Sequence, residues 1–270
     1  NQLTQIFVMS EAWAKANGCE ESYNWDAGET SYCASNANGT GPFKITFREQ
    51  DVRTVFEKNN DWWGDHSTHN IDKIELLPIK NDATRVAALL SGEIDYTNVV
   101  PVQDIERIKS SSAHTVKMTP SNRTIFFGMD QGSAELNSSN IKGKNPFADK
   151  RVRLAMYHAL DMDAIKDKVM RGQSFPAGII TAPGINGHTP ERDTRFAYDP
   201  ELSKKLLAEA GYADGFELTL DCPNDRYIND EAICVAAIGM FSKIGVKVNL
   251  DAKTKSQHFS EVKEGDANGM

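Results

Sequence analysis

The sequence predicts an α/β fold, and three recurring patterns carry that prediction. Short stretches alternate apolar and polar residues with the period of two that is typical of a strand, as in residues 43–47 and 216–220. Longer stretches repeat apolar residues with the spacing of a helix buried along one face, most clearly in residues 149–160. Glycine, asparagine, aspartate and proline separate the two kinds of stretch. Strands that alternate with helices in this way favour parallel pairing in a layered sheet.

The first half of the chain is expected to contribute mainly strands. Extended segments are predicted at residues 43–47, 52–57, 74–79, 95–100, 116–118 and 124–129. A helix is predicted over residues 81–90, closed by Gly92, and a shorter helix is predicted after Pro101.

The second half begins after a break in the pattern. Residues 130–148 fit neither period and are the best candidate for a domain boundary. Asp149 is suited to cap the helix that follows, and Phe147 can pack back on its first turn. The apolar stripe of this helix consists of Val152, Ala155, Met156, Ala159 and Leu160. A second short helix follows, then a helix over residues 199–211 and a strand–helix–strand unit over residues 216–250.

Composition limits the possible functions. The net charge of −8 argues against a nucleic-acid partner, whose phosphates favour a basic face. No apolar run approaches the roughly 18 residues that span a bilayer, and the mean hydropathy of −0.48 is typical of an ordinary soluble protein. The first residues have neither the basic start nor the apolar core of a signal peptide, which is uninformative if the chain is a fragment.

The four cysteines form two close pairs in the sequence, Cys19 with Cys33 and Cys222 with Cys234. Neither spacing fits the Cys-x-x-Cys ligand pairs of a zinc site. Catalysis would favour a single cysteine in a charged and half-exposed site. We therefore predict two local disulfides, with buried free thiols as the alternative.

No catalytic residue, metal site or cofactor is predicted. His66 and His69 have a spacing that could seat a metal ion, but their segment has no apolar phase and is better interpreted as a solvated loop. The sequence contains no Ser–His–Asp order, nucleophile elbow or glycine-rich phosphate loop. The carboxylates show no paired, buried context that would indicate acid–base chemistry.

Five motifs in order resemble the peptide-type (family 5) solute-binding proteins of bacterial ABC importers. The run NPFADKRVR from residue 145 resembles the family's Pro-Phe-x-Asp-x-Arg-Val-Arg signature, which opens the second lobe. The other four are GTGPF at residues 39–43 with NNDWWG at 59–64, SGEID at 91–95, DPE to LLAEAGY at 199–212, and IGVKV at 244–248. Together they span roughly residues 39 to 250.

The resemblance implies a two-lobed architecture of the periplasmic-binding-protein type II kind, incomplete at both ends. Residues 1–129 are expected to be the later part of lobe one, and residues 130–270 the first part of lobe two, so that the chain is an internal fragment. The implied location is the periplasm, an oxidising compartment that suits disulfides. The implied partners are a peptide ligand and the membrane permease of the ABC transporter, and the intact protein is expected to be a monomer.

The resemblance also suggests where a ligand would bind. An extended peptide is held chiefly through backbone hydrogen bonds, while its side chains occupy permissive pockets. The candidate ligand-binding residues are Thr97, Asn98, Phe126, Phe127, Met129, Gly39, Thr40 and Gly41. Adjacent strand residues face opposite ways, so one of Phe126 and Phe127 is expected to pack in the core instead. The glycine motif is alternatively a simple turn.

The function predicted from the resemblance is capture of a peptide between two lobes and its delivery to the permease, without catalysis. A nickel chelate, haem or another non-peptide solute is an alternative within the same fold, and a periplasmic hydrolase is an alternative from another class. The resemblance places the carboxylate that would bind the ligand's ammonium group just beyond Met270. The 270-residue chain alone is therefore expected to fold but to bind peptides negligibly.

Overall fold

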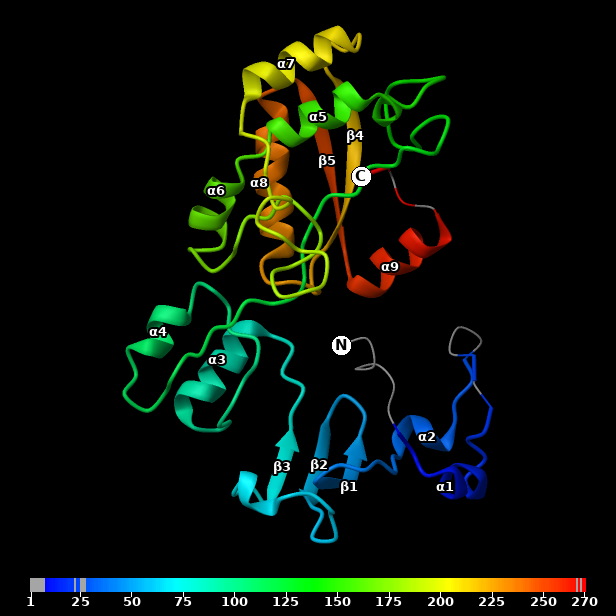
Figure 1. The fold of residues 1–270 in the computed structure, drawn as a ribbon, viewed down its shortest axis with the longest axis vertical. Helices are drawn as coiled ribbons and strands as arrows, with labels where there is room; N and C mark the ends of the chain where they lie inside the picture. The colour runs from blue at the N-terminus through cyan, green and yellow to red at the C-terminus, as the bar shows by residue number, and fades with distance from the viewer. Residues whose placement is uncertain (1–7, 22, 25–27, 266, 268) are drawn as a thin grey trace. The chain divides into compact units, whose positions relative to one another are not determined.

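The computed structural model describes residues 8–21, 23–24, 28–265, 267 and 269–270. The chain divides into two compact units, Asn1–Arg85 and Val86–Met270. Figure 1 labels their helices and strands, and each unit is described by itself.

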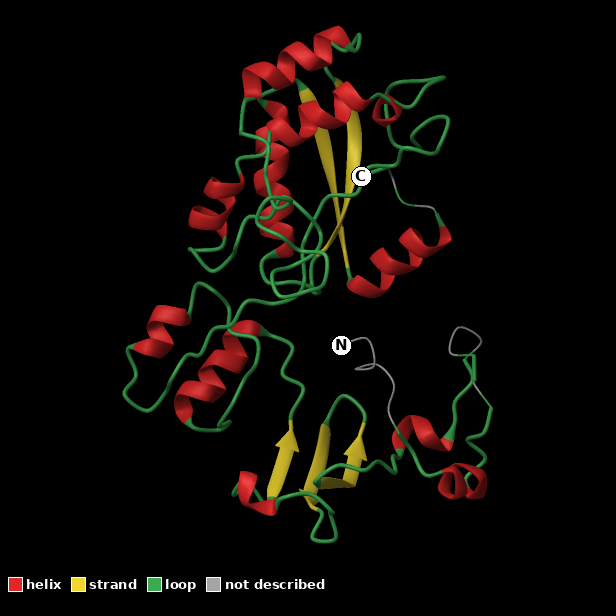
Figure 2. Cartoon of the chain, in the orientation of Figure 1, coloured by secondary structure: helices red, strands yellow, loops and turns green. Residues whose placement is uncertain are grey.

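The first unit contains a three-stranded antiparallel sheet (Figure 2). Its strands are β1 (Phe43–Glu49), β2 (Arg53–Lys58) and β3 (Lys73–Leu76), paired in that order. The parallel pairing that the strand–helix alternation favours does not apply to these strands, and residues 52–57 return beside residues 43–47 after the turn predicted between them. Only three residues connect β1 to β2, with Asp51 at a φ of 60°, and so short a connection permits only antiparallel pairing.

Two short helices and a disulfide precede this sheet. Helix α1 (Glu11–Ala16) begins after Ser10, whose side chain accepts a hydrogen bond from the Trp13 backbone, and α2 (Tyr32–Ser35) follows. The turn η3 (His66–Thr68) lies between β2 and β3. Val55 is the one described hydrophobic residue of this unit that is buried, so this sheet has little core of its own.

The second unit is built on two parallel strands, β4 (Phe216–Pro223) and β5 (Val246–Lys253). Helix α8 (Asp230–Ser242) connects them and packs on both, which is the predicted strand–helix–strand unit (Figure 1). Gly269 adds a parallel bridge to Thr219 on β4. The main hydrophobic core lies here, since Leu218, Val246 and Phe241 are fully buried.

Helices α5 (Lys150–His158) and α7 (Pro200–Glu209) pack against each other and against this core. Asp149 and Asp199 cap them as predicted, each accepting a hydrogen bond from a backbone N–H of the first turn. The buried Ser203 hydroxyl on α7 donates to the Ala155 carbonyl at 2.8 Å and so joins the two helices. This part also contains helix α9 (Lys255–Glu264) and three shorter elements, namely η4 (Pro146–Ala148), α6 (Met162–Ala164) and the π-helical turn η5 (Ile165–Val169).

Helices α3 (Asp82–Ser91) and α4 (Ile105–Lys109) form two smaller clusters. Val86, Leu89 and Ile108 form one cluster, and Val102 and Ile105 join Met170 in the other. The second cluster connects α4 to Met170, and both belong to the second unit. These compact units do not test the predicted division into lobes over residues 1–129 and 130–270, which stays a prediction. No helix in the described ranges combines the length and apolarity needed to cross a bilayer.

Three segments predicted as strands, residues 95–100, 116–118 and 124–129, are irregular. A strand is stabilised by a ladder of hydrogen bonds to a neighbour, and none of the described strands pairs with them. Residues 126–129 nevertheless keep the expected alternation, because Phe127 and Met129 pack on the core while Phe126 is 63% exposed; Ile125, which should face the core, is exposed. The alternation thus indicated which side chains of residues 126–129 point inward, but the strand predicted for this segment did not form.

Candidate ligand-binding site

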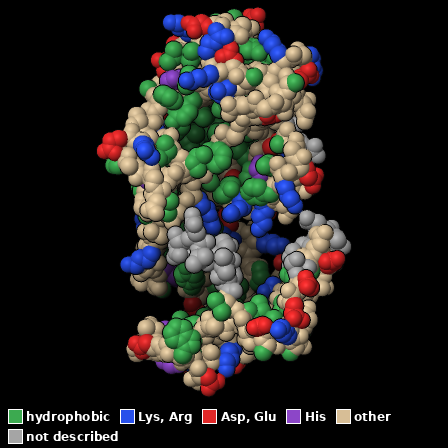
Figure 3. Space-filling view, turned by 45° about the vertical axis from the view of Figure 1, so that its right-hand side comes forward, with side chains coloured by type: hydrophobic (Ala, Val, Ile, Leu, Met, Phe, Trp, Pro, Cys, Tyr) green, Lys and Arg blue, Asp and Glu red, His purple; other side chains and the backbone are tan. Residues whose placement is uncertain are grey.

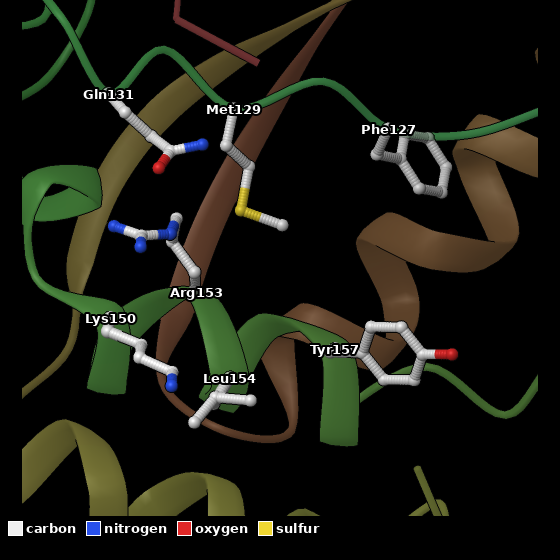
Figure 4. Close-up of a pocket in the computed structure, with 7 residues that line it drawn as sticks. All are labelled: Phe127, Met129, Gln131, Lys150, Arg153, Leu154 and Tyr157. Atoms are coloured by element: carbon white, nitrogen blue, oxygen red, sulfur yellow. The ribbon is translucent and has the colours of Figure 1, made fainter. Parts of the chain in front are cut away.

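An open pocket of about 290 Å³ lies in the second unit, between an extended segment and helix α5 (Figure 4). Phe127, Met129 and Gln131 line it from the segment. Lys150, Arg153, Leu154 and Tyr157 line it from α5. In the space-filling view, hydrophobic side chains gather on the visible surface of this part of the chain (Figure 3).

The sequence of α5 explains why the helix presents this second face. Val152, Ala155 and Met156 are fully buried against the core. The pocket residues 150, 153, 154 and 157 follow the spacing i, i+3, i+4 and i+7, so they share another side of the same helix. The Asp149 cap fixes the residue at which the helix begins, and this determines which residues face the core and which face the pocket.

Nitrogen-bearing side chains gather at one end of the pocket (Figure 4). One terminal guanidinium nitrogen of Arg153 donates to the carbonyls of Phe147 at 2.7 Å and Ala148 at 3.1 Å, which anchors the side chain. Lys150 is exposed and has no hydrogen bond or ion pair with any described residue. The pocket lining therefore carries two cations, the Gln131 amide and no carboxylate.

The two carboxylates that flank this end have other partners. Asp149 pairs with Arg151 at 2.6 Å, and the side-chain hydrogen bonds from Arg151 hold the pKa of Asp149 below its ordinary value. Asp130 accepts hydrogen bonds from the backbone of Ser133 at 3.1 Å and Gly132 at 2.8 Å. Hydrogen bonds from Ser133 likewise lower the pKa of Asp130. Both carboxylates are thus ionised at neutral pH and directed to their own partners.

The other end of the pocket is aromatic. Phe127 meets Phe241 of α8 edge to face, with ring centroids 6.3 Å apart. Tyr157 meets Phe196 in the same manner at 5.1 Å, and burial raises the pKa of its hydroxyl. These contacts hold two rings in place at the edge of an open cavity.

The predicted ligand-binding residues fall in three places. Phe127 and Met129 line the pocket and also pack against the core, so one of the two adjacent phenylalanines does pack inward, as expected. Thr97 and Asn98 lie on an irregular segment outside the pocket.

Gly39, Thr40 and Gly41 belong to the first unit, where they form a braced turn. The Thr40 carbonyl accepts a hydrogen bond from the Trp62 indole at 3.0 Å, and the Gly41 carbonyl accepts one from Asn59 at 3.3 Å. These bonds join the glycine motif to the Trp-Trp-Gly motif.

The sequence analysis missed Gln131 and the four pocket residues on α5. Leu154 and Tyr157 carried a usable signal, because they are apolar or aromatic residues of a helix that lie off its buried stripe. Gln131 carried none, since its position depends on the path of an irregular segment.

The structure pairs the cysteines as predicted, with sulfur–sulfur distances of 2.03 Å for Cys19–Cys33 and 2.05 Å for Cys222–Cys234. His66 and His69 lie on the loop between β2 and β3, where His66 contacts the Trp62 carbonyl and His69 stacks on Phe43. Within the described ranges, no three His, Cys, Asp or Glu side chains are grouped as metal ligands.

The fold defines a structural class, the periplasmic-binding-protein type II-like architecture. The structure resembles a periplasmic binding protein, DppA from Helicobacter pylori solved with the peptide STSA, with a TM-score of 0.70 and 24% identity over 97% of this chain. It also resembles a dipeptide-binding protein from Pseudoalteromonas solved with Met-Leu, with a TM-score of 0.68 and 24% identity. The chain covers 46% and 48% of these two structures, and likeness at this identity establishes the fold alone.

Within that class, the chain belongs to family 5. Residues 5–269 match the family described as bacterial extracellular solute-binding proteins, family 5 Middle. The periplasmic oligopeptide-binding protein OppA of Salmonella typhimurium is 31% identical over 80% of this chain. The dipeptide-binding protein of Escherichia coli is 26% identical over 86%, and heme-binding protein A of Haemophilus influenzae is 28% identical over 89%. The chain spans 39 to 42% of the length of these relatives.

Proposed function

We propose that this chain is part of the solute-binding component of an ABC import system, which captures a peptide between two lobes and delivers it to a membrane permease. The observation that carries the proposal is membership of family 5 together with 31% identity to a periplasmic oligopeptide-binding protein. The proposed location is therefore the periplasm. The intact protein is proposed to act as a monomer and to release its ligand unchanged.

All residues proposed for this wall of the peptide site belong to lobe one, residues 1–129, and residues 130–270 would form the facing lobe. An extended peptide would bind through its backbone, as a strand binds to a sheet edge. The residues proposed to line its path are Phe126, Phe127, Met129, Thr97, Asn98, Gly39, Thr40 and Gly41. The exposed ring of Phe126 and the half-buried Met129 support this proposal, because both leave apolar surface available to a ligand side chain.

A non-peptide solute is the second candidate, and one observation favours it. Heme-binding protein A is 28% identical over more of this chain than either peptide-binding relative above. The same architecture also includes a protein named NikA, solved with an iron chelate, at a TM-score of 0.70.

Native mass spectrometry of the full-length protein purified from periplasm tests the proposal, because a captured solute adds its own mass. Peptide masses that disappear on unfolding are the expected result, whereas haem or a metal chelate would favour the second candidate. Calorimetry against a library of di- to pentapeptides then compares the full-length protein with the 270-residue chain. We expect binding by the former and negligible binding by the latter.

A turnover screen separates binding from hydrolysis. The peptides are recovered after incubation and weighed by mass spectrometry, and we expect them unchanged. Cleaved products that persist in a repurified sample would overturn the proposal in favour of an enzyme.

A further inference from the structure

The pocket beside α5 contains chemistry that the proposed peptide path does not use. Lys150, Arg153 and Gln131 occupy one end, and none of them belongs to that path. We infer that this pocket binds a compact monocarboxylate that carries an aromatic or branched apolar group.

The charge of the pocket selects a carboxylate. The chain as a whole carries a net charge of −8, yet the lining holds two cations and no acid. Asp130 and Asp149 lie close by in the sequence but accept their hydrogen bonds from their own neighbours, and Asp149 interacts with Arg153 only through the electrostatic attraction of their charges. Arg153 uses one terminal nitrogen to hold its position, which leaves its other N–H groups as donors for a planar anion. Lys150 adds an exposed ammonium group without a described partner.

The shape of the pocket selects the apolar group. Figure 4 shows the nitrogen atoms of Gln131, Lys150 and Arg153 at one end and the rings of Phe127 and Tyr157 at the other. Met129 and Leu154 lie between them, so a ligand would meet a polar end and an apolar floor. A volume of about 290 Å³ is at the small end of small-molecule sites, which begin at roughly 300 Å³, and it suits one ring with a short acid side chain.

Two sources could present this group, namely a free aromatic acid or the carboxy-terminal residue of a peptide. The shared chemistry is the carboxylate beside an apolar side chain. The pocket lies within the second unit, so its binding is measurable on this chain, and it shares Phe127 and Met129 with the proposed peptide path.

The test titrates the 270-residue chain, labelled with ¹³C at its methionine methyl groups, with 3-phenylpropionate and with 3-phenylpropionamide. We expect the Met129 methyl resonance to shift with the acid at a Kd on the order of 1 mM, which suits a ligand of so few atoms in an open pocket. The uncharged amide should bind at least about fivefold more weakly, and added salt should weaken only the acid. The peptides Gly-Gly-Phe and Gly-Gly-Phe-amide form the second arm. A shift with Gly-Gly-Phe alone would identify a peptide terminus as the source, and a shift with phenylpropionate alone would identify a free acid.

Lys150→Gln should weaken binding of the acid at least about fivefold. Lys168→Gln is the matched control, because it removes an equal charge from an exposed helical lysine outside the pocket. Arg153→Lys keeps the positive charge but loses the planar pair of N–H donors that can bind both oxygens of a carboxylate. It should therefore weaken binding of the acid more than binding of the amide. Any one of three results would overturn the inference. These are equal affinities for acid and amide, equal effects of the two glutamine variants, or no shift of the Met129 resonance up to about 20 mM of either acid.

Discussion

The Lys253 ammonium group lies 3.0 Å from the Asp221 carboxylate and thereby joins the carboxyl ends of the two parallel strands. The pair is buried, since the Lys253 side chain is 10% exposed and that of Asp221 is 4% exposed. Lys253 also contacts Asp251 at 2.7 Å and Glu261 of α9, so one cation connects β4, β5 and α9. Burial alone would lower the pKa of Lys253, but the hydrogen bonds that its ammonium group donates to the three carboxylates outweigh burial and raise it.

Lys253→Met should destabilise the second unit by about 3 to 5 kcal/mol, because the buried Asp221 charge loses its ion pair with Lys253. Urea unfolding followed by far-UV circular dichroism measures this effect. All four tryptophans lie at residue 63 or earlier, so tryptophan fluorescence would report on the first unit instead.

Lys247→Met is the matched control for Lys253→Met. Lys247 lies on the same strand and pairs with Glu217, but its side chain is 68% exposed, so its loss should cost less than about 1 kcal/mol. Adding Asp221→Asn to Lys253→Met should restore part of the stability. Equal losses for the two lysine variants would show that the buried network does not stabilise the fold.

Gly215→Ala should prevent correct packing at the start of the parallel sheet. A Cβ atom at Gly215 would fall 1.8 Å from the Gly245 carbonyl oxygen, and the residue has a φ of +74°. The atoms that the Cβ would meet belong to the backbone of Gly245, which cannot shift as a flexible side chain could. We therefore expect a loss of more than about 3 kcal/mol in the free energy of unfolding. Gly128→Ala, where a Cβ meets nothing within 4 Å, should be nearly neutral in the same urea experiment.

The Cys222–Cys234 disulfide closes a short loop between β4 and α8. Replacing both cysteines by alanine should lower the free energy of unfolding by about 3 kcal/mol, because the unfolded chain regains the entropy of an open loop. Thiol titration of the unfolded and unreduced protein should find no free thiol. Four titratable thiols would contradict both disulfides at once.

Asp149→Ala should cost about 1 kcal/mol at pH 7, because the variant loses the N-cap of α5. The pKa of Asp149 is lower in the folded protein, so its charged contribution is present above the ordinary carboxyl pKa of about 3.9 and is lost as the pH falls through the folded value. The stability difference between wild type and variant should therefore shrink between about pH 5 and pH 3. Asp149→Asn, which keeps a capping oxygen, should lie between the two at pH 7. A difference that does not change with pH would show that the charge of Asp149 contributes nothing.

Sequence patterns predicted those helices and strands that are stabilised by residues close to them in the sequence. Asp149 and Asp199 began helices where the sequence placed them, because a cap acts within one turn. The strand–helix–strand unit formed as expected, since its apolar residues already defined one buried face for each element. Residues 126–129 alternated correctly but formed no strand, because a ladder requires a partner that the local sequence does not specify.

The sequence by itself determined the family, the two disulfides and the faces of the helices, because motifs, cysteine spacing and periodicity are all local properties. Only the tertiary structure brought Gln131 to the outer face of α5 and Lys253 to Asp221. Gln131 is 19 residues from Lys150 at the nearest point of α5, and Asp221 and Lys253 are 32 residues apart. Contacts at such separations follow from how the helices and strands pack, which is why no spacing rule in the sequence predicted them.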